Sequence, residues 1–260
     1  MKRIAPAIVL ITVLMTAAIL AGCVPGFFNA GPTETREYNI SDFTEVEAGF
    51  AFKMDITPSD KYSIAVTAGE NVFKYIDVYK SGNALKIEVK GFHWPFANTR
   101  LEAKITMPEL HGLNLSGAAR GNAKGFKSSQ DFNLVLSGAS TLDMDIEAGN
   151  FKSEVSGASK FTGSLKASSS NIELSGASDI KLKGSGGNII IDGSGASHFE
   201  LTDFTVNDAA IDLSGASHAS MEVNGKMDVS LSGASSLRYG GNPMMGRLDI
   251  TGASEIKQTP

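Results

Sequence analysis

Apolar and polar residues alternate along most of the chain between Tyr38 and Met107. A period of two is typical of β-strands, and two segments with turn chemistry, Pro58-Ser59-Asp60 and Ser81-Gly82-Asn83, separate the runs. The segment 70–79 is ambiguous, and no amphipathic run is long enough to predict a helix. The pattern therefore predicts a β region that forms either irregular first coils of a solenoid or a small β cap on one end of it. The alternating apolar positions are Phe50, Phe52, Met54, Ile56, Tyr62, Ile64, Val66, Leu85, Ile87, Val89, Leu101, Ala103, Ile105 and Met107.

Downstream, the pattern becomes a repeat built around the tetrapeptide Ser-Gly-Ala-Ser. Apolar residues recur three residues before its first Ser, immediately before that Ser, and five residues after it. Alternation on both sides of the tetrapeptide predicts two short strands that meet at a bend. Eight copies, 18 to 21 residues apart, begin at Ser116, Ser137, Ser156, Ser175, Ser194, Ser214, Ser232 and Thr251.

A steady period of about 19 residues indicates a solenoid. One such unit has too few large apolar side chains to offset the entropy of ordering its own backbone, so the units must stack. Stacking pairs each strand with the coils above and below it and turns the repeated offsets into apolar columns. We therefore predict an all-β protein, a right-handed single-chain parallel β-helix of coils of about 19 residues.

The tetrapeptide is best interpreted as the corner of each coil. Gly takes backbone conformations that are strained for other residues, Ala keeps the corner narrow, and the serines hydrogen-bond locally. A catalytic serine needs a base and an orienting group beside it, and eight near-identical corners do not provide that unique setting. The repeat thus predicts structure, and the sequence indicates no catalytic residue and no cofactor.

The amino-terminal segment up to Cys23 predicts that the protein is exported from the cytoplasm. Lys2 and Arg3 precede an apolar run from Ile4 to Leu20, and Leu20-Ala21-Gly22-Cys23 closely resembles the bacterial lipobox. The resemblance implies a lipoprotein signal peptide at 1–22, removed before Cys23, and lipid such as palmitate on that thiol. A lipidated tether at 23–36, the amino-terminal β region or first coils at 37–110 and the repeat β-helix at 111–260 would follow. An uncleaved membrane anchor or a buried free cysteine is the alternative.

Composition narrows the choice of partners. Without residues 1–22, the chain has 21 basic and 28 acidic residues, a net charge of −7. Such a surface argues against nucleic acid or anionic lipid headgroups as the main partner. The single cysteine excludes an intramolecular disulfide. The membrane, reached through lipid on Cys23, and an envelope polysaccharide or protein are the expected partners, on the periplasmic or extracellular side.

Three groups of side chains are candidates for binding. The first is an aromatic cluster, which can either stack on a ligand or close one end of the core. The second is a column of carboxylates two residues before the tetrapeptide, which we expect about 4.8 Å apart on consecutive coils. It forms either a solvated face or a site for a cation such as Ca²⁺ or a basic partner. The third is the pair of histidines that follow two adjacent corners. They could share a metal ion only if a further ligand completed the site. The aromatic cluster is Phe92, Trp94 and Phe96; the carboxylate column is Glu154, Glu173, Asp192 and Asp212; the histidine pair is His198 and His218.

Taken together, the strands between Tyr62 and Val89, the run from Ile105 to Leu110 and the Ser-Gly-Ala-Ser ladder resemble the auto-transporter adhesin, head GIN domain family of exported bacterial proteins and lipoproteins. The resemblance covers about Ile40 to Ile250. It implies a right-handed parallel β-helix and a cell-envelope location, and it brings no catalytic motif. The leading hypothesis is a lipid-anchored, non-enzymatic protein that presents a binding surface, adhesin-like or sensory. A polysaccharide lyase or hydrolase and a structural spacer are the alternatives.

Overall fold

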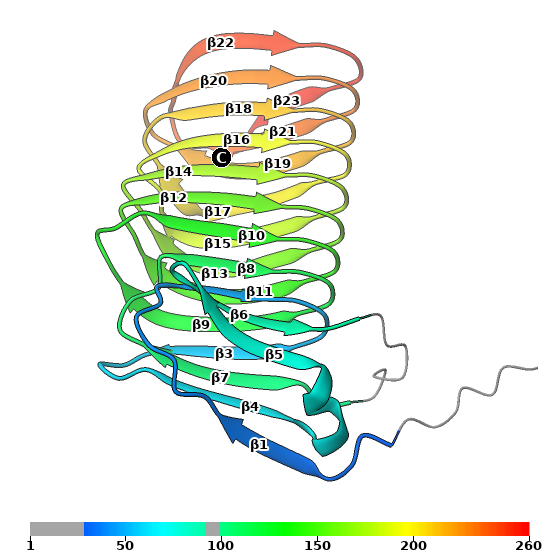
Figure 1. Ribbon diagram of the computed structural model, residues 1–260. Coiled ribbons are helices and arrows are strands. Elements are labelled where there is room, and N and C mark those ends of the chain that lie inside the picture. The colour runs from blue at the N-terminus through cyan, green and yellow to red at the C-terminus, as the bar shows by residue number, and fades with distance from the viewer. Residues whose placement is uncertain (1–28, 92–98, 260) are drawn as a thin grey trace, which may run out of the picture.

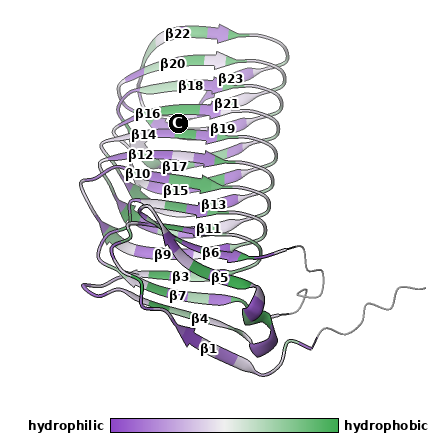
Figure 2. Cartoon of the chain, in the orientation of Figure 1, coloured by the Kyte–Doolittle hydropathy of each residue, from purple (hydrophilic) through white to green (hydrophobic). Residues whose placement is uncertain are grey.

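The computed structural model describes residues 29–91 and 99–259. These residues form a right-handed parallel β-helix with two facing sheets, so the predicted all-β solenoid is confirmed (Figure 1). Each repeat unit gives one strand to each sheet, and the core lies between the sheets. Along single strands, polar and apolar residues both occur, because one side of each strand faces the core and the other faces solvent (Figure 2).

Sheet A, the 12-stranded sheet, continues from the amino-terminal end to the carboxyl-terminal end of the solenoid. In spatial order its strands are β1 (Thr33–Glu37), β4 (Ser63–Gly69), β7 (Glu102–Met107), β3 (Lys53–Pro58), β9 (Arg120–Lys127), β11 (Thr141–Glu147), β13 (Lys160–Lys166), β15 (Asp179–Ser185), β17 (His198–Val206), β19 (His218–Val223), β21 (Ser236–Gly240) and β23 (Glu255–Gln258).

Sheet B, the 11-stranded sheet, lies on the other side of the core. From the amino-terminal end its strands are β5 (Ile76–Ser81), β6 (Ala84–Val89), β2 (Glu45–Ala48), β8 (Gly112–Leu115), β10 (Phe132–Leu136), β12 (Asn150–Val155), β14 (Ser169–Leu174), β16 (Asn188–Gly193), β18 (Ala209–Leu213), β20 (Lys226–Leu231) and β22 (Met244–Ile250).

The apolar offsets of the repeat form continuous columns inside the solenoid. Leu136 pairs with Val155 in sheet B, and Leu142 pairs with Phe161 in sheet A. Pairing in this register continues from coil to coil, and each column residue is buried by the equivalent residue of the next coil. The large apolar members that are at most 3% exposed are Leu113, Leu115, Leu134, Leu136, Leu142, Val155, Phe161, Ile172, Leu174, Ile180, Ile191, Phe199, Ile211, Leu213, Val229, Leu231 and Leu237.

The tetrapeptide forms the corner between sheet B and sheet A, as predicted. Gly157 has a φ of 77°, and the N–H of Ala158 donates to the carbonyl of Gly138 in the preceding coil at 2.7 Å. The last Ser of the corner turns inward: Oγ of Ser140 donates to the carbonyl of Ser137 at 2.8 Å. The same hydrogen bond, at 2.6 to 2.9 Å, is made by Ser178, Ser197, Ser217 and Ser235. The serines are therefore part of the stacked corner.

The amino-terminal region contains both coils and a cap. Strands β2 and β3 form one coil and β6 and β7 form another, but β8 and β9 stack on the earlier pair, β2 and β3. The stacking order of these coils thus differs from their order in the chain. At the end of the solenoid, β1 and β4 extend sheet A and β5 extends sheet B, all through antiparallel pairing. The ambiguous segment forms the 3₁₀ helix η1 (Glu70–Tyr75), which buries Val72 and Phe73, and then β5.

Candidate binding surface

The predicted carboxylates lie on the outer face of sheet B, on the consecutive strands β12, β14, β16 and β18. Glu154 pairs with Glu173, Glu173 with Asp192, and Asp192 with Asp212. All four are exposed, because the residues on either side of each point into the core. We call these four residues the acidic column.

Only the first member of the acidic column is neutralised within the described residues. Nζ of Lys152 lies 2.7 Å from Oε1 of Glu154, and this hydrogen bond raises the pKa of Lys152. The described part of the chain offers no ion pair to Glu173, Asp192 or Asp212. Carboxylates at the spacing of neighbouring strands repel by about 0.9 kcal/mol per pair in water. The column is therefore a row of negative charge open to a ligand.

A groove of about 340 Å³ borders the acidic column on the side of the corners. Glu154, Glu173 and Asp192 line it, together with first-position corner serines. These serines donate backbone N–H groups to the preceding coil, and Oγ of Ser156 reaches the carbonyl of Leu136 at 3.5 Å. The groove therefore combines carboxylate acceptors with hydroxyl groups. The lining serines are Ser156, Ser175 and Ser194.

A second groove, of about 510 Å³, lies at the start of the same strands. Polar residues 19 positions apart form a ladder along its edge: Oδ1 of Asp131 accepts from Nδ2 of Asn150 at 2.9 Å, and Oγ of Ser169 donates to Oδ1 of Asn150 at 2.7 Å. Asn188 follows Ser169 in the register of the sheet. This ladder was not among the sites predicted from the sequence. The signal was present, since the column six residues before the tetrapeptide reads Asp131, Asn150, Ser169 and Asn188.

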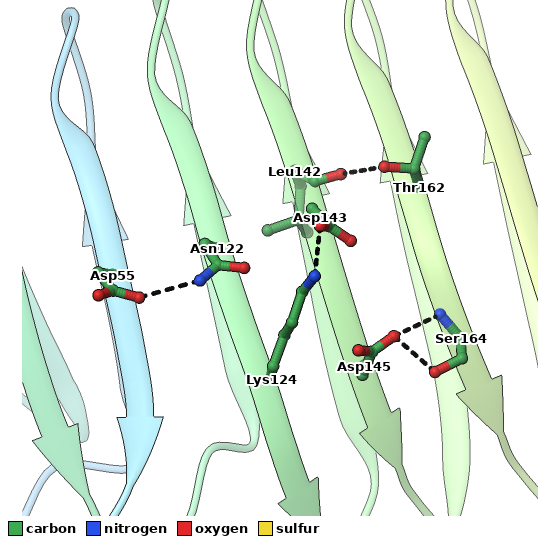
Figure 3. A network of polar contacts seen from close by, with 8 residues as sticks. All are labelled: Asp55, Asn122, Lys124, Leu142, Asp143, Asp145, Thr162 and Ser164. Carbon is green, nitrogen blue, oxygen red and sulfur yellow. Dashed lines mark hydrogen bonds and ion pairs between the residues drawn. The ribbon is translucent and has the colours of Figure 1, made fainter.

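The outer face of sheet A differs because several of its carboxylates have partners on the next strand (Figure 3). Nζ of Lys124 donates to Asp143 at 2.5 Å, and Glu200 pairs with Lys181. The hydroxyl of Ser164, at 2.6 Å, and its N–H, at 3.0 Å, both donate to Oδ1 of Asp145. These hydrogen bonds, chiefly that of the hydroxyl, lower the pKa of Asp145. Asp143 and Glu200 of sheet A are thus paired with lysines on the neighbouring strand, whereas Asp179 and Asp203 have no ion pair among the described residues.

The two histidines are adjacent, as predicted. His198 and His218 pair across β17 and β19, with ring centroids 6.4 Å apart and ring planes inclined by 48°. Within residues 29–91 and 99–259, no three His, Cys, Asp or Glu residues are grouped so that they could hold a metal ion. The histidine pair and the acidic column therefore supply no complete metal site in that part of the chain.

Two of the sequence-predicted sites lie outside the described residues. Cys23, with the lipobox, belongs to the segment 1–28, and the aromatic cluster of Phe92, Trp94 and Phe96 belongs to the segment 92–98, which connects β6 with β7. Within the described residues, no helix combines the length and the apolar character needed to cross a membrane.

Comparison with known proteins gives both a family and a fold. The family model "Putative auto-transporter adhesin, head GIN domain" matches residues 42–243. No curated protein sequence matches the chain. A crystal structure of a putative adhesin from Parabacteroides merdae is similar at 17% identity and a TM-score of 0.81, covering 88% of this chain and 97% of that one.

Two further crystal structures share the fold. A putative lipid binding protein from Parabacteroides distasonis is similar at 20% identity and a TM-score of 0.78, covering 88% of this chain and 98% of that one. For a putative adhesin from Bacteroides fragilis the identity is 19% and the TM-score 0.64, covering 88% of this chain and 97% of that one. Because the family model spans most of the solenoid, from before β2 to beyond β21, the chain belongs to the auto-transporter adhesin, head GIN domain family.

Proposed function

We propose that the protein is a non-enzymatic, lipid-anchored protein of the cell envelope that binds a positively charged ligand with the outer face of sheet B. The observation that carries the binding role is the acidic column, in which Glu173, Asp192 and Asp212 are exposed and have no ion pair within the described residues. Membership of an adhesin family supports a binding role, and the segment around Cys23 supports the anchor.

The charge of the column defines the class of ligand. Each carboxylate has another on a neighbouring strand, so a partner that brings positive charge along the solenoid axis relieves several repulsions together. The hydroxyl groups of Ser175 and Ser194 in the adjoining groove add hydrogen-bonding capacity at the same place. A lysine-rich segment of an envelope protein or an amino-sugar polysaccharide has this chemistry.

Neutralising the column tests the binding role. We expect the full chain with Glu154→Gln, Glu173→Gln, Asp192→Asn and Asp212→Asn to bind oligolysine at least about tenfold more weakly than wild type, a loss of about 1.4 kcal/mol. The matched control removes the same number of charges from sheet A, through Asp143→Asn, Asp179→Asn, Glu200→Gln and Asp203→Asn. Isothermal titration at several salt concentrations measures both.

The outcomes separate the alternatives. Equal weakening in both variants would mean that net charge, and not the acidic column, attracts the ligand. If wild type bound neither oligolysine nor envelope polysaccharides, the structural spacer would replace the proposal. Product release from such polysaccharides, lost in Glu154→Gln or Glu173→Gln, would replace it with a polysaccharide-active enzyme.

The anchor is tested by a single substitution. We expect Cys23→Ala to abolish metabolic labelling of the protein with a palmitate analogue and to move it from the membrane fraction to the soluble fraction or to unprocessed precursor. Durable anchoring takes two or more acyl chains, each contributing about 0.8 kcal/mol per buried methylene, so the change should be close to complete. Ser81→Ala, at the end of β5 and far from Cys23 in the sequence, is the control. Retained label in Cys23→Ala would contradict the proposal.

A further inference from the structure

The carboxyl-terminal coil leaves the end of the core open. Met245, Leu248 and Ile250 of β22 continue the columns of Met227, Val229 and Leu231, which are buried in the coil before it. Leu248 is 51% exposed, whereas Val229 is 2% exposed. Ile256 of β23 likewise follows the buried Leu237 in sheet A. The apolar interior of the solenoid is thus presented to solvent at this end.

Both sheets also end here in an unprotected edge. Strands β22 and β23 are the last strands of sheets B and A, and no described strand pairs with their outer edges. Every residue from Met244 to Ile250 is exposed, and β22 contains no proline. Edge strands of this kind readily pair with another chain. The opposite end is different, because β1, β4 and β5 add antiparallel strands there and η1 lies beside them.

Each of the two edge strands has charges that match those of a second, identical strand when the two pair antiparallel. Strand β22 reads Arg247-Leu248-Asp249, and β23 reads Glu255-Ile256-Lys257. When β22 pairs with a second β22 about Leu248, each arginine lies opposite the aspartate of the other copy, and β23 does the same about Ile256. Pairing β22 with β23 about those centres would instead place like charges opposite each other. Opposite charges across strands stabilise a sheet and like charges destabilise it.

We propose that two copies of the chain associate tail to tail, with β22 pairing antiparallel to β22 and β23 antiparallel to β23 about a two-fold axis perpendicular to the solenoid. The contact continues both sheets from one copy into the other and covers Met245, Leu248, Ile250 and Ile256. Because the same surface is used twice, the assembly closes at two copies. The proposal is independent of the ligand and the anchor proposed above.

Charge reversal and its rescue test the contact. We expect the full chain in detergent to sediment as a dimer and Arg247→Asp, which sets aspartate against aspartate twice, to weaken the dimer at least about tenfold. Adding Asp249→Arg to Arg247→Asp restores the complementarity and should restore the dimer. Lys152→Glu is the matched control, since Lys152 and Glu154 form an equivalent pair two residues apart on β12, in mid-solenoid. It should leave the dimer unchanged.

Cross-linking reports on the same contact without changing its charge. Under mild oxidation in a Cys23→Ser background, Leu248→Cys should form a disulfide-linked dimer, because the two-fold axis brings its Cα atoms within about 5.5 Å. Ile190→Cys, which is exposed on β16 of sheet B, should not. A monomeric wild type, species larger than a dimer, Arg247→Asp without effect, no rescue by the double variant, or equal cross-linking at the two positions would each overturn the proposal.

Discussion

Gly157→Ala is expected to lower the free energy of unfolding by about 3 kcal/mol or more, because two penalties coincide at this corner. Its φ of 77° costs an alanine about 1–2 kcal/mol. A Cβ atom at Gly157 would also lie 2.3 Å from the carbonyl oxygen of Gly138. That oxygen accepts the N–H of Ala158, so the corner must open and weaken a hydrogen bond between coils.

Gly82→Ala separates the two penalties. Gly82 has a φ of 60° in the turn between β5 and β6, and no atom lies within 4 Å of the Cβ that alanine would add. Its cost should be the penalty of the left-handed backbone alone, about 1–2 kcal/mol. Guanidinium unfolding followed by circular dichroism measures both variants. If Gly157→Ala cost no more than Gly82→Ala, stacking of the glycine corners would not contribute to stability.

The repeat could be read from the sequence because each of its features recurs at the same offset. A single Leu before a Ser indicates little, but a large apolar residue at that place in seven of the eight repeats defines a column, and the structure buries that column in all but the last coil. The acidic column could be placed on one face for the same reason. Since Leu174 and Ile172 point inward, Glu173 between them must point outward.

The amino-terminal coils could not be placed because their order is set by pairing between distant strands. Nothing local to β8 indicates that it lies on β2 and not on β6. One corner in this region also lacks the tetrapeptide sequence. Phe50, with a φ of 63°, stands beneath Gly117 where the other coils have glycine, so the tetrapeptide is absent from the sequence while its backbone shape remains. The N–H of Ala118 donates to the carbonyl of Phe50, as the N–H of Ala158 donates to Gly138.

The residues of the open end could be read from the sequence, but whether they are buried depends on the topology. Leu248 and Ile250 match the buried columns in residue type, so the repeat alone predicts burial. The structure shows both to be exposed, because a column residue is buried by the next coil and no described coil follows. Because no described coil covers this end, the ion pair of Arg247 and Asp249 lies at the surface of one copy and is available to the second copy in the proposed dimer.

Substitutions at Gly193 and Phe199, which lie in the core of one coil, should have strongly non-additive effects on the free energy of unfolding. Gly193 occupies the column that holds Leu or Val in most other coils, and a Cβ atom there would lie 2.7 Å from both Cε2 of Phe199 and Cδ2 of Leu213. The fully buried side chains of Phe199 and Leu213 therefore share the space that the missing side chain leaves. Phe199→Ala should cost about 3–5 kcal/mol by opening a cavity. Gly193→Leu should cost about 1–3 kcal/mol by overpacking.

Gly193→Leu combined with Phe199→Ala should then be more stable than Phe199→Ala alone, because the leucine enters the cavity, with a coupling energy of about 1–3 kcal/mol. Gly193→Leu combined with Phe161→Ala is the control. Phe161 lies two coils away, so this pair should be additive within about 0.5 kcal/mol. Guanidinium unfolding of all five variants measures both cycles. Additivity in the first cycle would show that Phe199 does not occupy the space beside Gly193, and that packing is set by each column separately and not by volume shared across the core.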